Sequence, residues 1–301
     1  MSTDPSGSRL QAPFDVAVVM TTRRAGTLAA ALRSVFAQTL AGRVQVIVGV
    51  DGPHGDRAAL DRAVGEAPPT MAVTAIDPGY STSRSQGGVH APADGGSLRA
   101  ALTLLANARR VAYLSERNRY APEHLDSLLR AIGDRAWAHS LRWFVEAASG
   151  QVLCRDEWDS VGPGRGIYAQ SEGGYAAPDT LLVDKLACAA AIPAWTQADA
   201  EGRGEDRRFF RAIRGLPHST SGEPSVYQPV RFDRLHPFLI AQFRRHGVRI
   251  ERYVELTPQM AAEVDRAEQA IRAQADAARG TLSVQGVDFA VGAARKDRAD
   301  R

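Results

Sequence analysis

Nearly continuous apolar runs alternate with amphipathic stretches in the first half of the chain. Residues 14–20 (FDVAVVM) and 44–50 (VQVIVGV) are such runs, which are typical of strands buried on both faces of a parallel sheet. Between them, apolar side chains from Leu28 to Phe36 recur at helical spacing and predict a helix with one apolar stripe. The pattern therefore predicts a βαβ unit, in which both strands end at the same edge of the sheet.

Further along, the same alternation predicts a series of shorter elements. They are a helix at 57–65, a strand at 71–76, a long surface loop at 78–96, a helix at 97–108, a strand at 111–114, a helix that starts near Pro122, a hairpin within 137–154, a strand passing into a helix at 179–192, and helices at 205–213, 236–247 and 258–280. We predict an α/β fold: a Rossmann-like, mostly parallel sheet flanked by helices, with a mixed or antiparallel portion and a C-terminal helical extension.

The two ends of the chain differ from the rest in polarity. Residues 1–12 and 293–301 are polar enough to predict a disordered N-terminus and a flexible tail. We assign residues 13–215 to the α/β domain and residues 216–292 to the helical extension, which we expect to pack on the same domain. No internal repeat is visible in the sequence.

Composition and charge narrow the class of protein. Hydrophobic residues make up 44% of the 301 residues, which is enough for a sizeable core, and 37 Lys and Arg against 34 Asp and Glu leave a net charge of +3. The charges are interspersed, so there is no sign of a nucleic-acid partner, whereas phosphate-bearing small molecules remain candidates. Cys154 and Cys188 have neither disulfide nor metal-ligand spacing, which indicates a reducing, cytoplasmic location.

No window of the sequence approaches the ~20 apolar residues that a membrane span needs, and the first residues lack an apolar signal region. We therefore expect a soluble chain without a transmembrane segment. The basic segment 231–252 is compatible with peripheral contact to a membrane that carries an anionic, lipid-linked acceptor, although a solvated helix face is the more ordinary interpretation.

The order of residues also resembles that of a known enzyme family. VAVVMTTRRAGTLAAALRSVFAQT followed by VQVIVGVDGP is similar to the opening of glycosyltransferase family 2, whose members have the GT-A fold. The similarity continues at Ser97, Leu98 and Arg99, at YLSERNRYAPEHL and at GRGEDRRFFRAI, and it covers roughly residues 14–215. It implies an enzyme that moves a sugar from a nucleotide-diphosphate sugar to a hydroxyl of a polysaccharide, lipid-linked or small-molecule acceptor.

The resemblance assigns the nucleotide sugar to residues at the strand ends. It places Thr21, Arg24 and Asp51 where the base and ribose would lie, and Asp51 can accept hydrogen bonds from a base NH or a ribose hydroxyl. Arg99, at the start of a helix, would meet a phosphate or hold an acidic neighbour. Two simpler interpretations stay open: Asp51 in Asp-Gly-Pro builds a turn, and Arg24 is a solvated loop charge.

The stretch YLSERNRYAPEHL occupies the place of the family's Asp-x-Asp motif, whose acids hold Mg²⁺ or Mn²⁺. Ser115 and Arg117 replace the outer acids and leave Glu116 as the one remaining candidate ligand, so we expect weakened or absent metal dependence. Arg117, with Arg119 nearby, can supply permanent positive charge to the diphosphate instead. Alternatively, Arg117 pairs with Glu116 or another acid and the site is degraded.

GRGEDRRFFRAI matches the family's Glu-Asp motif. By that analogy Asp206, and next Glu205, would be the carboxylate that takes the acceptor's proton in an inverting transfer. Helix capping is the alternative, because acids in a first turn interact favourably with the helix dipole.

The missing Asp-x-Asp acids favour a second function, a catalytically inactive GT-A relative that binds nucleotide, glycan or a partner protein, and the intact Glu-Asp pair opposes it. A nucleotidyltransferase is disfavoured, because no Gly- and Lys-rich phosphate loop follows the first strand.

Overall fold

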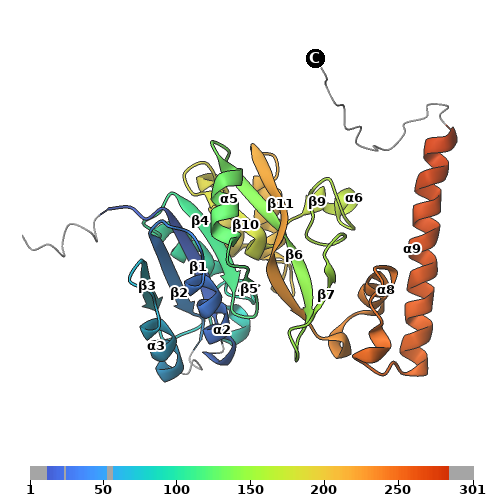
Figure 1. Cartoon of the computed structure of the whole chain (residues 1–301), viewed down its shortest axis with the longest axis horizontal. Helices are drawn as coiled ribbons and strands as arrows, with labels where there is room; N and C mark the ends of the chain where they lie inside the picture. The colour runs from blue at the N-terminus through green and yellow to red at the C-terminus, as the bar shows by residue number, and fades with distance from the viewer. Residues whose placement is uncertain (1–11, 24, 53–56, 285–301) are drawn as a thin grey trace, which may run out of the picture. The chain divides into compact units, whose positions relative to one another are not determined.

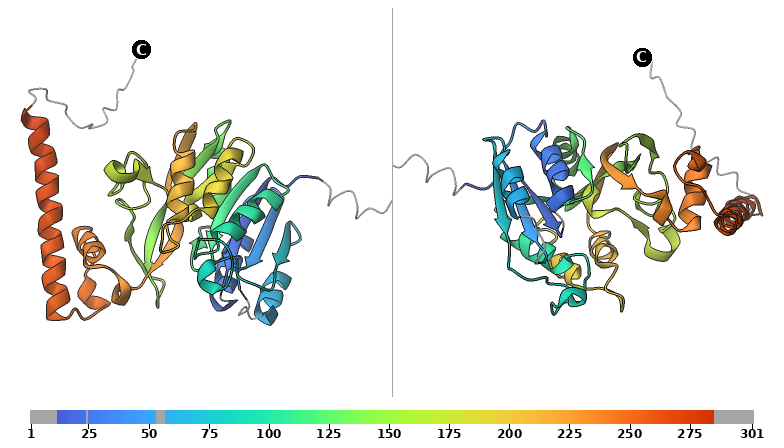
Figure 2. Two further views of the ribbon diagram at one scale, coloured as in Figure 1. Left: turned by 180° about the vertical axis from the view of Figure 1, so that it is seen from behind. Right: turned by 90° about the horizontal axis from the view of Figure 1, so that it is seen from below.

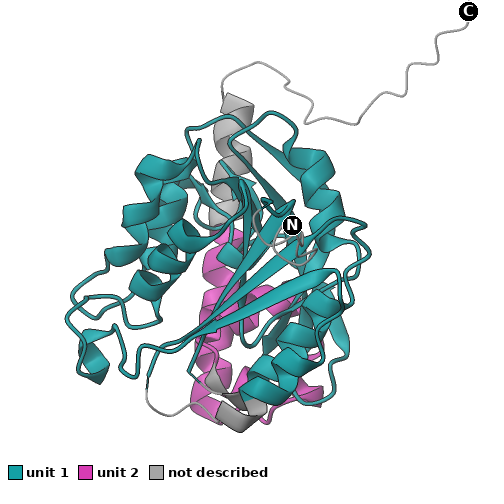
Figure 3. Cartoon of the chain, turned by 90° about the vertical axis from the view of Figure 1, so that its left-hand side faces the viewer, with its two compact units in different colours: residues 1–230 teal, residues 231–301 magenta. Residues whose placement is uncertain are grey.

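The computed structural model describes residues 12–23, 25–52 and 57–284 (Figure 1). The chain divides into two compact units, Met1–Val230 and Arg231–Arg301, which we call unit 1 and unit 2 (Figure 3). Apart from residue 12, the predicted disordered N-terminus and flexible tail lie outside the described residues.

The first half of unit 1 is a parallel sheet built from the predicted apolar runs. Its strands are β1 (Val16–Thr22), β2 (Val44–Val50), β3 (Met71–Ile76) and β4 (Arg110–Ser115). β1 lies between β2 and β4, and its residues from Val16 to Met20 are fully buried, because side chains on both faces of a central strand meet helices. The predicted βαβ unit is confirmed, with α2 (Ala25–Phe36) as its helix.

The second half of the sheet is mixed. Within the described residues the sheet has nine strands, and the further ones are β5 (Arg119–Tyr120), β6 (Trp137–Glu146), β7 (Val152–Arg155), β10 (Leu181–Asp184) and β11 (His218–Val230). The order is β3-β2-β1-β4-β10-β6-β11-β5, and β7 forms the predicted hairpin with β6. β10 is antiparallel to β4 and β6, whereas β11 is parallel to β6 and antiparallel to β5. The predicted α/β fold with a mixed portion is therefore confirmed.

Helices cover both faces of this sheet. α2, α3 (Arg57–Gly65) and α5 (His124–Ile132) lie on the face seen in Figure 1, and α4 (Gly96–Leu105) and α7 (Glu205–Ile213) lie on the opposite face (Figure 2). The remaining elements of unit 1 are the paired short strands β8 (Gly162–Pro163) and β9 (Gly174–Tyr175), the helix α6 (Ala169–Glu172), and the 3₁₀ segments η1 (Arg84–Gln86), η2 (Pro178–Thr180) and η3 (Ala189–Thr196).

The helical segment at the end of the chain begins later than the predicted residue 216. Residues His218–Val230 instead form β11, a 13-residue strand that extends the sheet beside β6. Its sequence, HSTSGEPSVYQPV, contains few apolar residues, two prolines and a glycine, so neither strand nor helix periodicity stands out. The strand forms because β6 and β5 supply backbone partners, and its ladder is irregular between Thr220 and Val226. The boundary of unit 1 accordingly follows Val230.

A second difference concerns the helix predicted within residues 179–192. The strand part of this prediction is β10, but the segment that follows, Ala189–Thr196, forms 3₁₀ turns rather than an α-helix. Pro193 lies inside the segment and has no backbone N–H to donate, which interrupts an α-helical ladder. These turns carry Trp195 into the core, where it is fully buried.

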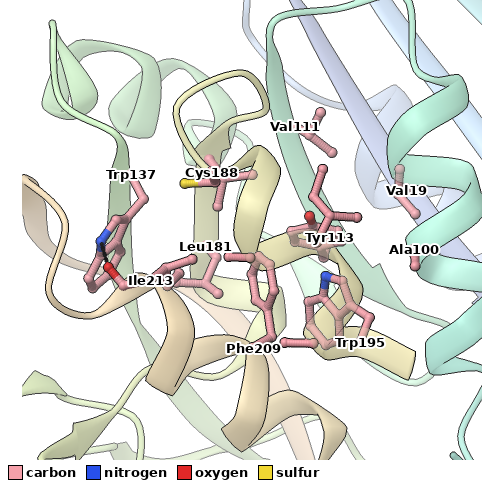
Figure 4. Close-up of a cluster of buried hydrophobic side chains, with 14 of the residues drawn as sticks. Val19, Ala100, Val111, Tyr113, Trp137, Leu181, Cys188, Trp195, Phe209 and Ile213 are labelled. Carbon is pink, nitrogen blue, oxygen red and sulfur yellow. Dashed lines mark hydrogen bonds between the residues drawn. The ribbon is translucent and has the colours of Figure 1, made fainter. Parts of the chain in front are cut away.

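An aromatic cluster fills the core between the sheet and α7 (Figure 4). Trp195 stacks on Phe209 with ring centroids 4.2 Å apart, and Tyr113 of β4 contacts both rings. At the C-terminal end of α7, Nε1 of Trp137 donates a hydrogen bond to the carbonyl of Ile213 (2.8 Å). These contacts fix the middle and the C-terminal end of α7 against the core, and its first turn lines the cavity at the carboxyl ends of the parallel strands.

Unit 2 contains two helices among its described residues, α8 (Pro237–Arg245) and α9 (Pro258–Val284), and they pack against each other. Two 3₁₀ segments accompany them, η4 (Phe232–Arg234) and η5 (Ile250–Arg252). Arg244 of α8 forms ion pairs with Glu251 (2.6 Å) and Asp265 (3.4 Å).

None of the described helices in either unit combines the length and the apolar character that crossing a membrane requires.

Candidate active site

A cavity of about 750 Å³ opens at the carboxyl ends of β1 and β4. Seven of the eight predicted site residues line it: Thr21, Asp51, Arg99, Glu116, Arg117, Glu205 and Asp206. The eighth, Arg24, lies outside the described residues. The sheet explains this convergence, because β1, β2 and β4 are parallel neighbours and the residues that follow them meet at one edge.

Asp51 anchors the loop that follows β3. The residue is 2% exposed, and its Oδ1 accepts hydrogen bonds from the backbone N (2.7 Å) and Oγ1 (3.0 Å) of Thr82 and from Oγ of Ser81 (3.3 Å). Its Oδ2 lies 3.3 Å from Nη2 of Arg23. Asp51 is thus more than a local turn former, because it connects the end of β2 to a distant loop and to a cation at the cavity wall.

Arg23 is a candidate that the sequence analysis missed. Its guanidinium lines the cavity, 3.3 Å from Asp51 and 3.8 Å from Asp94, and 33% of its side chain is exposed. The motif TTRRAG offers two adjacent arginines, and nothing in its pattern singles out Arg23. A guanidinium stays charged at any physiological pH, so Arg23 adds permanent positive charge to the site.

Glu116 ties the turn after β4 to the end of β1. Its carboxylate accepts hydrogen bonds from Oγ1 of Thr22 and from the backbone N of Arg23 (3.1 Å). The next residue, Arg117, is exposed and lines the cavity. Across the part of the chain that the structure describes, no three His, Cys, Asp or Glu side chains are grouped so that they could hold a metal ion. The turn therefore presents one carboxylate that already serves two protein donors, and one cation.

Arg99 is held in the first turn of α4 by two contacts. Its Nη2 donates to Oγ1 of Thr21 (3.3 Å), and its guanidinium lies over the ring of Trp195, 4.7 Å from the ring centroid. An aromatic face attracts the guanidinium without neutralising its charge. Because Trp195 belongs to the buried aromatic cluster, Arg99 presents its charge to the cavity from a fixed position.

Glu205 and Asp206 form the first turn of α7 and line the cavity. Glu205 is 5% exposed, and burial raises the pKa of its carboxyl from 4.5 to about 7, although nearby Arg99 acts in the opposite direction. Asp206 accepts hydrogen bonds from the hydroxyl of Tyr175 and from the backbone N of Arg207 (2.8 Å). Asp206 therefore lies in the first turn of α7, where the helix dipole favours an acid, and it also lines the cavity, so the two interpretations of this residue do not exclude each other.

The raised pKa of Glu205 predicts that stability depends on pH. Its folded-state pKa of about 7 exceeds the ordinary value of 4.5, so the folded chain binds this proton more tightly, and stability falls as the pH rises through that interval. Between about pH 5 and pH 8, the unfolding free energy of the wild type should therefore fall by roughly 2–3 kcal/mol relative to that of Glu205→Gln. Urea unfolding at several pH values measures this shift. Glu201→Gln, at an exposed position just before α7, is the matched control, and a pH-independent difference for Glu205→Gln would contradict the prediction.

Further polar side chains that were not predicted line the cavity, among them Asn118, Arg142, Asp179 and Gln228. Arg142 is 6% exposed within β6, where its Nε donates to Asp156 (2.7 Å) and its Nη2 to Asp159. Burial alone would lower the pKa of Arg142, but the two carboxylates raise it above its ordinary value. The one available signal was an arginine inside an aromatic, β-rich segment, WAHSLRWFVE.

At the level of sequence, neither a protein-family model nor a curated protein matches the chain. Solved structures do resemble it. A crystal structure of S. aureus TarS in complex with UDP has a TM-score of 0.53 at 12% identity and covers 77% of this chain and 63% of that one. Another S. aureus TarS structure has a TM-score of 0.53 at 10% identity, and the match covers 84% of this chain and 48% of that one. A third, in complex with UDP-GlcNAc, has a TM-score of 0.50 at 12% identity, and the match covers 83% of this chain and 70% of that one. This chain thus spans less than two thirds of the length of the first two structures.

TarS is a GT-A-type glycosyltransferase, and its structures share the mixed, curled sheet flanked by helices that unit 1 contains. The chain has the GT-A fold. The cavity described above lies at the strand ends of this fold, where open α/β sheets bind their ligands.

Proposed function

We propose that this protein transfers a sugar from a nucleotide-diphosphate sugar to a hydroxyl acceptor, as a member of glycosyltransferase family 2. One observation carries the proposal: Arg23, Arg99 and Arg117 converge in a single cavity with the acidic pair Glu205 and Asp206. A diphosphate needs the positive charges, and an acceptor hydroxyl that must lose a proton needs the acids. The fold similarity to S. aureus TarS structures in complex with UDP and with UDP-GlcNAc supports the same donor class.

In this proposal the donor nucleotide lies along the ends of β1 and β2. Thr21 and Asp51 would contact the base and the ribose, and Arg24 keeps its proposed place beside them. Arg99 and Arg117 would meet the two phosphates, because a guanidinium can contact two phosphate oxygens together.

The transfer itself is proposed as a single displacement that inverts the anomeric carbon. The acceptor oxygen attacks this carbon, the bond between the carbon and the diphosphate oxygen breaks, and the electron pair leaves with the diphosphate. Asp206 takes the acceptor's proton, and the arginines stabilise the charge that grows on the leaving group. Glu205, whose pKa burial raises to about 7, carries less negative charge beside Asp206 than an ordinary carboxylate would.

A divalent metal is not part of this proposal. Mg²⁺ and Mn²⁺ prefer several oxygen ligands. In the turn after β4, Glu116 is the one carboxylate, it accepts hydrogen bonds from Thr22 and Arg23, and Arg117 adds a positive charge beside it. These residues do not fit a divalent cation, so we derive no step through one and propose weakened or absent metal dependence.

A second candidate is a catalytically inactive GT-A relative that binds a nucleotide, a glycan or a partner protein. The replacement of the outer Asp-x-Asp acids by Ser115 and Arg117 favours it. This candidate predicts nucleotide binding without sugar transfer to any acceptor. The acceptor class, whether polysaccharide, lipid-linked or small molecule, and the cytoplasmic location stay predictions.

A thermal-shift screen of nucleoside diphosphates and nucleotide sugars, with and without Mg²⁺ and Mn²⁺, tests the proposed donor. A ligand that binds the folded chain alone raises its melting temperature. We expect the matching nucleotide to raise it without added metal, and a chelator to leave this shift unchanged. No response to any nucleotide would reject the donor proposal, whereas a strict metal requirement would reject the role given to the arginines.

Calorimetry on two arginine variants completes this experiment. Arg117→Ala should weaken binding of the matching nucleoside diphosphate about 10-fold, because a charge-assisted hydrogen bond is lost. Arg135→Ala is the matched control, since Arg135 is exposed and does not line the cavity. Equal affinities in the two variants would remove Arg117 from the donor site.

A further inference from the structure

Three of the unpredicted polar side chains form one cluster in the cavity wall. Asn118 ends the turn after β4, Asp179 lies in η2, and Gln228 lies in β11. Nδ2 of Asn118 donates to Oε1 of Gln228 (2.9 Å), and the carboxylate of Asp179 accepts a hydrogen bond from the backbone N of Ser115 in the same turn. These bonds join positions 110 and 64 residues apart in the sequence, so the fold builds this cluster from three separate segments.

This cluster contains hydrogen-bond acceptors that the described residues do not fully satisfy. Asn118 is 3% exposed, yet its Oδ1 has no hydrogen-bond partner within the described residues. Asp179 is 8% exposed, and its carboxylate accepts hydrogen bonds from Ser115 and Asn118. A carboxylate offers roughly four lone-pair positions, so this one can accept further hydrogen bonds. Buried polar atoms in folded proteins are nearly always paired, so an unpaired one at a cavity wall indicates a place for a ligand's donor.

The chemistry of the cluster fits the ring hydroxyls of a sugar. Each hydroxyl donates one hydrogen bond and accepts others. The oxygen of Asn118 and the carboxylate of Asp179 are acceptors for such protons, and Nε2 of Gln228, which donates to the carbonyl of Pro229 (3.3 Å), has a second N–H to offer in return. A phosphate group fits this cluster poorly, because phosphate oxygens accept hydrogen bonds and the cluster consists mainly of acceptors.

We propose that Asn118, Asp179 and Gln228 form the subsite that recognises the hydroxyls of the transferred sugar. This inference rests on the proposed function. The donor's diphosphate is proposed to lie against Arg117, and the sugar is bonded directly to that diphosphate, so its ring must lie beside the same turn. Asn118 follows Arg117 in the chain, and Asp206, the proposed base, lines the same cavity. The subsite thus holds the ring by its hydroxyls and leaves the anomeric carbon to the acceptor.

Matched pairs of ligands separate sugar recognition from nucleotide binding. The pairs are UDP with UDP-GlcNAc, UDP with UDP-glucose, and GDP with GDP-mannose, and calorimetry measures the affinity of each. For a pair that the wild type binds, Asp179→Asn should weaken binding of the nucleotide sugar about 10-fold and change that of the free diphosphate less than about 2-fold. Gln228→Met should also weaken binding of the nucleotide sugar selectively. Because Gln228 is half-buried rather than fully buried, this variant tests the proposed subsite even if Asp179→Asn does not fold. Gln151→Met, exposed in the turn between β6 and β7, is the matched control.

The possible results are distinct. A selective loss for the nucleotide sugar supports the subsite. An equal loss of affinity for both ligands of a pair overturns the proposal, and so does no loss of affinity for either ligand. A rise in the KM for the acceptor alone also overturns it, because that result would assign the cluster to the acceptor. If the wild type binds neither these pairs nor any nucleotide in the thermal-shift screen, the proposed function itself fails and this inference fails with it. Melting temperatures without ligand establish that each variant is folded.

Discussion

Replacing Asp206 with asparagine is expected to lower the turnover number for sugar transfer by about 10²- to 10⁴-fold, which is the usual contribution of a general base. An amide oxygen can still accept the hydrogen bond from the hydroxyl of Tyr175, so the local structure should survive, but an amide cannot take a proton from the acceptor. Affinity for the nucleoside diphosphate should change by less than about 2-fold, because binding depends on the arginines. Steady-state kinetics and calorimetry on the same samples measure the two quantities.

The control for Asp206→Asn is the same substitution at an exposed site. Asp134→Asn, in the turn after α5, removes a carboxylate that does not line the cavity, and it should leave both turnover and nucleotide affinity unchanged. If Asp206→Asn also keeps full turnover, Asp206 has no part in the chemistry, and its role is confined to the first turn of α7.

Arg142→Ala is expected to lower the free energy of unfolding of unit 1 by about 3–5 kcal/mol, because removing one partner of a buried ion pair leaves an uncompensated buried charge. Asp156 is fully buried, and although three backbone amides at positions 158–160 also donate to its carboxylate, none of them carries a positive charge. Asp159 loses the same cation. All four tryptophans of the chain lie in unit 1, so tryptophan fluorescence during urea unfolding reports on the unit that carries the change.

An arginine in an exposed pair provides the comparison. Arg130 pairs with Asp126 one helical turn away on the surface of α5, and 68% of its side chain is exposed. Arg130→Ala should cost less than about 0.5 kcal/mol, since water replaces most of such an interaction. Equal costs for Arg142→Ala and Arg130→Ala would show that the buried network around β6 contributes nothing to stability.

The parallel half of the fold could be predicted because its pattern is local. β1 and β2 are buried on both faces and read as continuous apolar runs, and parallel strands must end at one edge, which is why Asp51, Glu116 and Arg117 converge as expected. β11 could not be predicted, because its polar, proline-containing sequence becomes a strand through pairing with β6 and β5 rather than through its own periodicity.

The side chains of the site divide in the same way. Residues that belong to short motifs, such as Glu205 and Asp206, were identified by resemblance to a family. Arg23 was missed because adjacent arginines have the same sequence signal, and Asp179 and Gln228 were missed because no local pattern links them to the turn that they meet. Contacts between distant positions depend on the whole topology, and a single sequence does not reveal it.

The late position of β11 in the chain has a consequence for synthesis. Ribosomes release the N-terminus first, and β6 is complete at Glu146, long before its parallel neighbour has been translated. Until Val230 emerges, β5 lacks its ladder partner and one side of β6 is an open edge, the kind of surface through which nascent chains associate. Every proposed catalytic residue precedes β11, yet folding of unit 1 has to wait for this strand, which also brings Gln228 to the cavity.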